Sequence, residues 1–290
     1  MRKQIIEGEN FFLVQEQEKQ WDKFPTIIKS SGYTIDRKAI TQPWIWTQMR
    51  TIPFRNRSNR PDPLILGENE QLLKFCFPLR EVYTLYLKPN CKGMEEAQKE
   101  LSDYINASSK EFQFVGYSKG GVLIAGLDLK KPTKMAMITP TFGTIIWDEN
   151  RLKSCIKTYT SLEENISVGE KMELQVYEQL IHFLGSKRPV DLDISLESNY
   201  LKGKDFNSLW KHRILLVIAE CPQETINISD FLLKRMGKCF DLDKKGDGIV
   251  SLSNQQFLRR YAEEVLLVEA THATVLNKDE TLLKIKSFFR

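Results

Sequence analysis

The sequence predicts an α/β protein whose core is a doubly wound, mostly parallel sheet flanked by helices. Three observations support this prediction. Short runs of β-branched and aromatic residues alternate along the chain with longer segments of helical periodicity. Some of the short runs are apolar throughout, which is typical of strands that are covered on both faces. A glycine-rich hexapeptide at residues 116–121 then joins one apolar strand directly to an apolar helix.

The first half of the chain is expected to contain a helix followed by a βαβ unit. Residues 10–30 carry apolar side chains among charged ones in a helical pattern, so a helix is expected there. Residues 83–87 read Tyr-Thr-Leu-Tyr-Leu and predict a strand. Residues 94–107 place apolar side chains on one helical face, and residues 112–115 predict the next strand. Two strands joined through a helix by short links pair in parallel.

The second half of the chain continues the alternation. Residues 134–139 predict a strand, and residues 213–219 form a continuous apolar run, which predicts a strand buried on both faces. Residues 264–269 predict a further strand, and residues 279–289 a terminal helix. The pattern therefore supports a parallel sheet that extends through most of the chain.

The segment between the strands at 134–139 and 213–219 is too long for a single crossover connection. We expect it to form a helical lid insertion at about residues 145–210, over a site at the sheet edge. Residues 1–70 are expected to be an N-terminal extension with the first elements, packed on the core. Residues 71–290 then form the core domain, which includes the insertion.

The composition is that of an ordinary globular protein, with 41% hydrophobic and 28% charged residues. A net charge of +4 is too small to indicate a nucleic-acid partner. The first residues carry charges and no long apolar stretch, so neither a signal peptide nor an integral membrane segment is expected. We predict a cytoplasmic protein. The composition leaves the oligomeric state open.

The cysteines indicate neither a disulfide framework nor a metal site. They are odd in number, widely spaced and without a C-x-x-C pair, at positions Cys76, Cys91, Cys155, Cys221 and Cys239. The sequence also lacks a G-x-G-x-x-G motif after a strand and a G-x-x-x-x-G-K-[ST] motif, which disfavours a nucleotide-binding enzyme. No metal or other cofactor is expected.

The hexapeptide Gly-Tyr-Ser-Lys-Gly-Gly places Ser118 at the tip of a very sharp turn between strand and helix. Gly116 and Gly120 flank the serine because a Cβ atom would clash where the strand meets the start of the helix. The hydroxyl is then exposed as a nucleophile, and the first N–H groups of the helix can stabilise an oxyanion. The plainer alternative is a glycine-rich strand–helix turn with an exposed serine.

A serine nucleophile needs a base, and the chain offers only three histidines. His182 falls on an amphipathic helical pattern in the insertion. His212 comes directly before the strand at 213–219, so it is expected at the wrong end of the sheet. His272 follows the last strand, so it is expected at the carboxyl edge of the sheet that Ser118 also occupies. Position therefore favours His272 as the base over the other two.

The acid that orients the base is expected before His272 and at the same edge. Asp247 stands between two glycines, where the backbone can turn freely, and is the preferred candidate. Asp243 is the second choice, and Glu220 at the end of its strand is the third. The segment around Asp243 resembles the start of a calcium loop, but the position for the bidentate carboxylate holds Leu252, which makes calcium binding improbable.

From about residue 83 to its end the chain resembles the α/β-hydrolase superfamily, in particular lipase-like serine esterases. The resemblance rests on the Ser118 hexapeptide, the Gly-Asp-Gly-Ile-Val-Ser stretch at residues 246–251, the Thr-His pair ending at His272, and their order in the chain. It implies Ser118 as nucleophile, His272 as base and Asp247 as orienting acid. It also implies that the backbone N–H of Lys119 is one donor of the oxyanion hole.

The sequence departs from the family pattern in three places. It has no His-Gly dipeptide after an early strand for the second oxyanion donor, which residues 89–93 could replace. Lys119 stands where Met or Gln is more usual, and the first eighty residues carry no resemblance. The leading hypothesis is a serine hydrolase that cleaves an ester or related acyl bond of a small molecule through an acyl-enzyme. The alternatives are a catalytically silent binding module, or a thioesterase or peptidase with the same triad.

Overall fold

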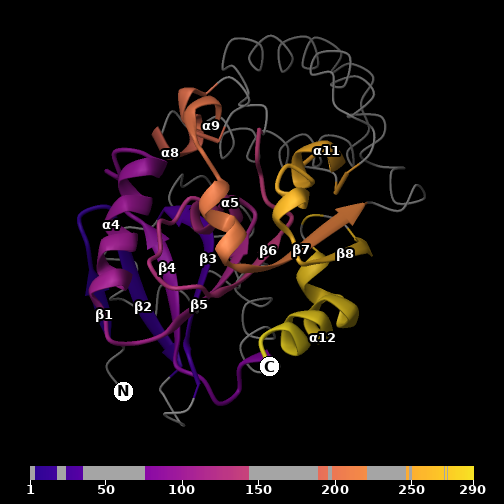
Figure 1. Cartoon of the computed structure of the whole chain (residues 1–290), viewed down its shortest axis with the longest axis horizontal. Coiled ribbons are helices and arrows are strands. Elements are labelled where there is room, and N and C mark those ends of the chain that lie inside the picture. Colours follow the sequence, from indigo (N-terminus) through magenta and orange to yellow (C-terminus); the bar gives the residue numbers. More distant parts are fainter. Residues whose placement is uncertain are drawn as a thin grey trace, which may run out of the picture.

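The computed structural model describes residues 4–17, 24–34, 76–143, 189–194, 198–220, 246–247, 250–270, 272 and 274–290. In these residues one sheet contains eight strands, in the order β1-β2-β4-β3-β5-β6-β7-β8 (Figure 1). Their bounds are β1 Ile5–Glu7, β2 Phe11–Gln17, β3 Thr26–Thr34, β4 Val82–Leu87, β5 Phe112–Tyr117, β6 Lys134–Ile138, β7 Arg213–Glu220 and β8 Glu264–Glu269.

The sheet is parallel except at its first edge. The pairs β1–β2 and β2–β4 are antiparallel, whereas every pair from β4 through β3, β5, β6 and β7 to β8 is parallel. Because the strands from β3 to β8 run in one direction, their carboxyl ends meet at a single edge. The predicted fold class is confirmed, and this edge is where sequence reasoning placed the candidate site.

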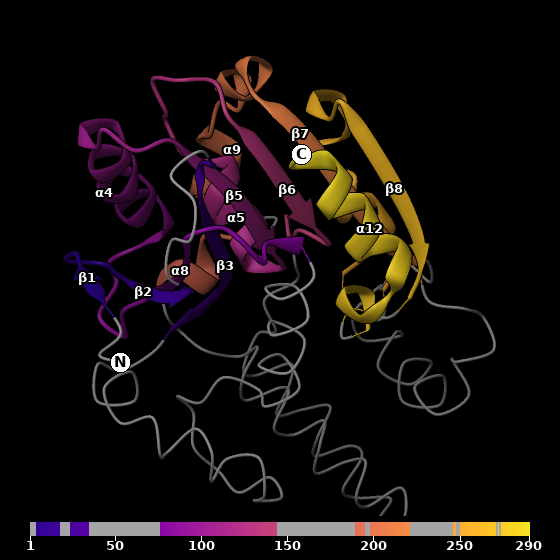
Figure 2. The ribbon, with the colours of Figure 1, turned by 90° about the horizontal axis from the view of Figure 1, so that it is seen from below.

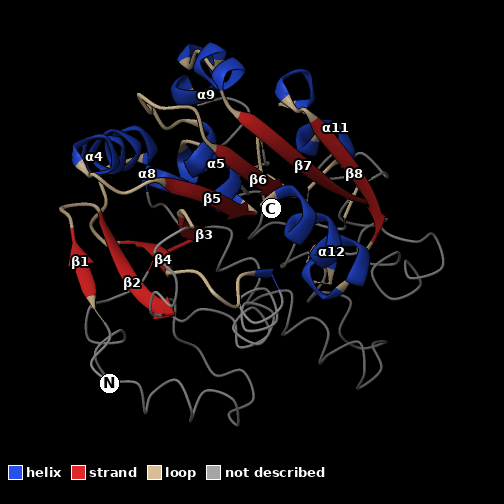
Figure 3. Cartoon of the chain, turned by 60° about the horizontal axis from the view of Figure 1, so that its bottom comes forward, coloured by secondary structure: helices blue, strands red, loops and turns tan. Residues whose placement is uncertain are grey.

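Helices cover both faces of the sheet. On one face α4 (Met94–Ala107) and α5 (Lys119–Ala125) pack on the core, and on the other face α12 (Asp279–Phe288) does so (Figure 3). Figure 2 shows α12 beside β7 and β8. The short helices are α8 Pro189–Leu192, α9 Asn199–Gly203, α11 Leu252–Gln255 and the 3-10 turns η3 Asn207–Lys211, η5 Arg259–Tyr261 and η6 Val275–Asn277.

Alternating side chains of the central strands build the two cores. In β7, Leu216 joins the cluster under α4 and α5, while its neighbours Leu215 and Val217 join the cluster under α12. All three side chains are fully buried. A strand covered on both faces has no polar side, which explains the continuous apolar run in the sequence.

The helix expected at residues 10–30 is wrong, because the described part of this segment forms β2 and β3. In β2, Phe11 and Leu13 belong to the core under α4, and Phe12 is covered by the ammonium group of Lys88. The apolar residues that suggested one face of a helix therefore alternate between the two faces of a strand. These strands pair within the main sheet, and β3 lies between β4 and β5.

The strands and helices predicted from residue 83 onward are confirmed, with shifts of one or two residues at their ends. Most of the predicted lid insertion, including the helical pattern around His182, lies outside the described residues. The boundary at residue 70 stays a prediction. No helix in the described part of the chain is long and apolar enough to cross a membrane.

Candidate active site

Ser118 lies at the sharp turn between β5 and α5. Its backbone has φ 55° and ψ −127°, a left-handed value that a residue with a side chain rarely adopts. The Ser118 N–H donates to the Ile138 carbonyl of β6 (2.9 Å), and the Gly121 N–H donates to the Ser118 carbonyl (2.9 Å). These bonds hold the serine backbone in this conformation at the carboxyl end of β5.

Two glycines are required for the turn to be this tight. A Cβ atom on Gly116 would stand 2.5 Å from the carbonyl oxygen of Gly120, and one on Gly121 would stand 2.8 Å from Cβ of Pro140. Neither distance is tolerable, and the first is to rigid backbone. The strand can therefore approach the start of α5 only because these positions lack side chains.

Asp247 and His272 are in direct contact. The Nδ1 atom of His272 lies 2.6 Å from Oδ2 of Asp247, and the His272 N–H donates to the Asp247 carbonyl (2.8 Å). Both residues are buried, with exposed fractions of 1% for Asp247 and 7% for His272. Of the two candidate acids that the structure describes, Asp247 and Glu220, Asp247 is the one that contacts the imidazole. Asp243 lies outside the described residues.

The second carboxylate oxygen of Asp247 is also occupied. Oδ1 accepts the N–H of Val250 (2.7 Å), and the Asp247 N–H donates to the Val250 carbonyl (3.2 Å). Gly246 precedes it with φ 150°, and a Cβ there would stand 2.3 Å from the Val250 carbonyl oxygen. This short turn directs Oδ2 toward the histidine.

The buried amide of Gln255 anchors the turn to the sheet. Its Oε1 accepts the Ala219 N–H (2.8 Å), and its Nε2 donates to the carbonyls of Ala219 (2.9 Å) and Val250 (3.0 Å). Ala219 is near the carboxyl end of β7, so Gln255 connects that end to the loop of Asp247. Sequence reasoning did not single out Gln255.

Tyr117, which directly precedes Ser118, contacts His272. Its hydroxyl donates to the His272 carbonyl (2.5 Å), and the two rings stack with centroids 5.0 Å apart and an interplanar angle of 30°. The structure therefore brings the Asp247–His272 pair against the last residue of β5. Within the described residues, no hydrogen bond joins the Ser118 hydroxyl to His272.

Comparisons with known proteins support the fold. No protein-family model and no curated protein sequence matches the chain. Its structure is similar to the mature lipase BlEst2 of Bacillus licheniformis, with a TM-score of 0.54, 13% identity, and coverage of 96% of this chain and 97% of that one. It is also similar to the serine hydrolase CCSP0084 of the polyaromatic-hydrocarbon degrader Cycloclasticus zankles, with a TM-score of 0.50, 14% identity, and coverage of 99% and 97%. The chain has the α/β-hydrolase fold.

Within this α/β-hydrolase fold, His212 lies at the opposite edge of the sheet from His272. It directly precedes β7, and its Nδ1 accepts the N–H of Thr133, which directly precedes β6 (3.2 Å). Burial, with a smaller contribution from Lys211, lowers the pKa of His212 to about 4. The prediction that His212 lies at the wrong end of the sheet is confirmed.

Lys119 is the first residue of α5, so its backbone N–H lies at the start of a helix next to Ser118. The suggestion that residues 89–93 supply the second oxyanion donor fits the α/β-hydrolase fold poorly, because β3 separates β4 from β5. Two N–H groups of this loop are also occupied, by the Lys88 carbonyl and the Asn10 side chain. The chain that follows β3, from residue 35 to residue 75, lies outside the described residues.

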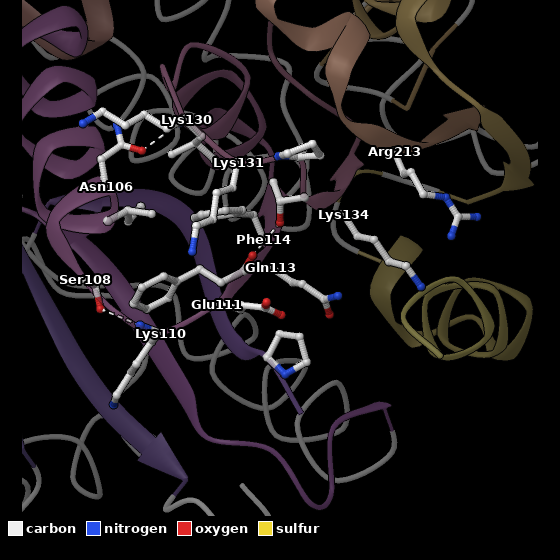
Figure 4. Close-up of a pocket in the computed structure, with 16 residues that line it drawn as sticks. Asn106, Ser108, Lys110, Glu111, Gln113, Phe114, Lys130, Lys131, Lys134 and Arg213 are labelled. Carbon is white, nitrogen blue, oxygen red and sulfur yellow. Dashed lines mark hydrogen bonds between the residues drawn. The ribbon is translucent and has the colours of Figure 1, made fainter. Parts of the chain in front are cut away.

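A cavity of about 310 Å³ lies at the amino ends of β5, β6 and β7, away from the Asp247–His272 pair (Figure 4). Five of its sixteen lining residues are cationic, namely Lys110, Lys130, Lys131, Lys134 and Arg213. Two of these cations are paired, Lys110 with Glu81 and Arg213 with Glu263. The cavity takes no part in the candidate active site. No cluster of three or more His, Cys, Asp or Glu residues suited to a metal occurs in the described ranges.

Proposed function

We propose that the protein is a serine hydrolase that cleaves an ester or related acyl bond of a small-molecule substrate through an acyl-enzyme intermediate. Ser118 is the nucleophile, His272 the general base and Asp247 the acid that orients it. The observation that carries the proposal is the 2.6 Å contact between Asp247 and His272, held against the strand that ends directly before Ser118. The two similar solved structures, a lipase and a serine hydrolase, agree with it.

The contact with Asp247 determines which imidazole nitrogen can act. A carboxylate only accepts hydrogen bonds, so Nδ1 of His272 carries a proton and donates a hydrogen bond to Oδ2 of Asp247. The Nε2 atom is then the unprotonated nitrogen and can accept the proton of the Ser118 hydroxyl. When it does, the carboxylate stabilises the imidazolium that forms.

The reaction proceeds in two halves. Ser118 Oγ attacks the acyl carbon while its proton passes to His272, and the carbonyl oxygen becomes an oxyanion near the N–H of Lys119. The intermediate collapses, the bond to the leaving group breaks, and His272 returns the proton to the departing alcohol. Water then attacks the acyl-enzyme with His272 again as base, which releases the acid and restores Ser118.

Labelling with a fluorophosphonate probe tests the proposal. We expect the wild type to be labelled, and the Ser118→Ala and His272→Ala variants to lose labelling. Ser287→Ala is a matched control, because Ser287 is an exposed serine of α12 whose hydroxyl donates to the Lys284 carbonyl. Labelling that persists in Ser118→Ala would show that another nucleophile reacts.

A folded wild type that stays unlabelled would instead favour the alternative of a binding module with no acyl chemistry. A panel of p-nitrophenyl esters, acyl thioesters and peptide amides, assayed on the same variants, separates an esterase from a thioesterase or a peptidase. The three share the triad and differ in which acyl bond is turned over fastest.

A further inference from the structure

Tyr117 occupies the position between Gly116 and the proposed nucleophile, and its side chain is directed to the base rather than to solvent. It is 4% exposed and belongs to the core cluster that also contains Ala270 and Val275, on either side of His272. Tyr117 therefore shares a core cluster with residues that come shortly before and shortly after His272 in the sequence. Its position is fixed by the core and not by solvent-exposed contacts.

The backbone of His272 is held from two directions. Its N–H donates to the Asp247 carbonyl (2.8 Å), and its carbonyl accepts the Tyr117 hydroxyl (2.5 Å). The first bond links the histidine to the loop that carries Asp247, called the acid loop below, and the second bond links it to β5. In the part of the chain that the structure describes, Tyr117 is the hydrogen-bonded link between β5 and His272.

This link spans a considerable distance. His272 follows β8, and β6 and β7 separate β8 from β5. Three strand spacings amount to about 14 Å, so the histidine must reach back across two strands to serve Ser118. Without a direct contact, errors in the positions of β6, β7 and the acid loop would add up at the imidazole. A displacement of about 1 Å is enough to slow a reaction of this kind roughly a hundredfold.

The ring contact adds an electrostatic contribution. The imidazole of His272 stacks on the Tyr117 ring with a centroid separation of 5.0 Å. A cation within about 6 Å of an aromatic face is attracted by the electron-rich face. The stack therefore favours the imidazolium that forms when Ser118 loses its proton, and it restricts rotation of the imidazole about its own axis.

We propose that Tyr117 is a positioning residue, which sets the place of His272 relative to Ser118 through its ring and its hydroxyl. This inference rests on the proposed function, since it assigns Tyr117 a task in the Ser118–His272 reaction. It predicts that the ring and the hydroxyl contribute separately, with the larger share from the ring.

The test compares Tyr117→Phe, which keeps the ring, with Tyr117→Leu, which removes it. For turnover of p-nitrophenyl acetate we expect kcat to fall about fivefold in Tyr117→Phe and roughly 10- to 100-fold in Tyr117→Leu, with KM nearly unchanged. The fluorophosphonate labelling rate should fall in the same order. Tyr83→Phe is the control, because Tyr83 is a buried tyrosine of β4 whose hydroxyl bonds Gln4 and Glu81, and it should keep wild-type kcat.

Proton NMR provides a readout that does not depend on activity. The Nδ1 proton shared by His272 and Asp247 is expected to give a resonance downfield of the amide region, which His272→Gln identifies by its loss. We expect this resonance to shift and broaden in Tyr117→Leu, to change less in Tyr117→Phe and to stay in place in Tyr83→Phe.

The outcomes separate the two proposals. A labelled wild type with unchanged kcat and an unchanged resonance in both Tyr117 variants would overturn the positioning role and leave the hydrolase proposal intact. An unlabelled wild type would overturn the hydrolase proposal, and the NMR comparison would still decide whether Tyr117 positions His272. Loss of kcat in Tyr83→Phe equal to that in Tyr117→Phe would reduce the effect to general stability and overturn the assignment.

Discussion

Two buried histidines lie at opposite edges of the same sheet, and the difference between them is instructive. Their exposed fractions are nearly equal, 7% for His272 and 6% for His212. The Nδ1 atom of His272 faces a carboxylate, whereas Nδ1 of His212 accepts a backbone N–H from Thr133. His272 therefore donates a hydrogen bond through Nδ1, whereas His212 accepts one there.

The partner and the edge, rather than burial, distinguish a candidate base from a structural histidine. A carboxylate partner favours a positive imidazolium, which a base must become during the reaction. A backbone N–H favours the neutral imidazole, and burial lowers the pKa of His212 to about 4.

Removing the charge at Asp247 should have the largest effect. In Asp247→Asn an amide NH₂ facing Nδ1 of His272 would favour the tautomer with the proton on Nε2, which cannot accept the Ser118 proton. We expect kcat on an ester substrate to fall by about 10³- to 10⁴-fold with little loss of stability. Asp243→Asn serves as the control and should keep wild-type kcat. The reverse result would move the role of the acid to Asp243.

A methyl group at Gly116 should disrupt the tight turn between β5 and α5 that carries Ser118 at the carboxyl edge of the sheet. In Gly116→Ala the new Cβ would stand 2.5 Å from the carbonyl oxygen of Gly120, and both partners are backbone. We expect the free energy of unfolding to fall by about 3 kcal/mol, measured by urea denaturation. Gly203→Ala in α9 is the matched control, because a Cβ there meets nothing within 4 Å and should leave stability unchanged or slightly higher. Equal stability of the two variants would contradict the geometry of the turn.

The sheet from residue 82 onward could be predicted from the sequence because its central strands are apolar on both faces and because short links join β4 through α4 to β5. The edges at which His272 and His212 lie could also be predicted, because a residue that follows a strand of a parallel sheet lies at the carboxyl edge and one that precedes a strand lies at the opposite edge. Asp247 was preferred over Asp243 on the basis of its flanking glycines; Asp247 contacts His272, and Asp243 lies outside the described residues, so the choice between them stays a prediction. The cytoplasmic location and the lid stay predictions.

Other features could not be read from the sequence. The strand nature of β2 was missed because its burial depends on β1 and β4, and β4 is far away in the chain. Tyr117 and Gln255 were missed for a related reason, since their partners lie 155 and 36 residues away along the chain. Local patterns report periodicity and turn chemistry, and they do not report which distant backbone group a buried polar side chain will meet.

Gln255 allows the acid loop to be weakened without a change in its chemistry. Gln255→Leu would leave the Ala219 N–H and the carbonyls of Ala219 and Val250 without their side-chain partner. We expect the free energy of unfolding to fall by about 2 to 3 kcal/mol and kcat to fall in the folded protein as the Asp247 loop shifts. Thr26→Val is the control, because it removes a buried hydrogen bond to Glu81 at the amino edge of β3. It should lower stability and leave kcat unchanged, and an equal loss of kcat would contradict the division between the edges.

The smallest effect concerns the pH dependence that His212 gives to stability. Its pKa is about 4 in the folded protein and near the ordinary 6.5 when unfolded, so the unfolded chain binds the extra proton first as the pH falls. The protein should therefore lose roughly 1 to 2 kcal/mol of stability through His212 between pH 7 and pH 5, and most of the loss should come below pH 6.5. His212→Asn removes the titration, and its Oδ1 can still accept the Thr133 N–H. We expect urea unfolding of this variant to show a flatter pH dependence than the wild type over that range, with unchanged kcat at pH 7. A variant with the wild-type slope would mean that His212 does not titrate differently on folding, and the contrast between the two histidines would then rest on their partners alone.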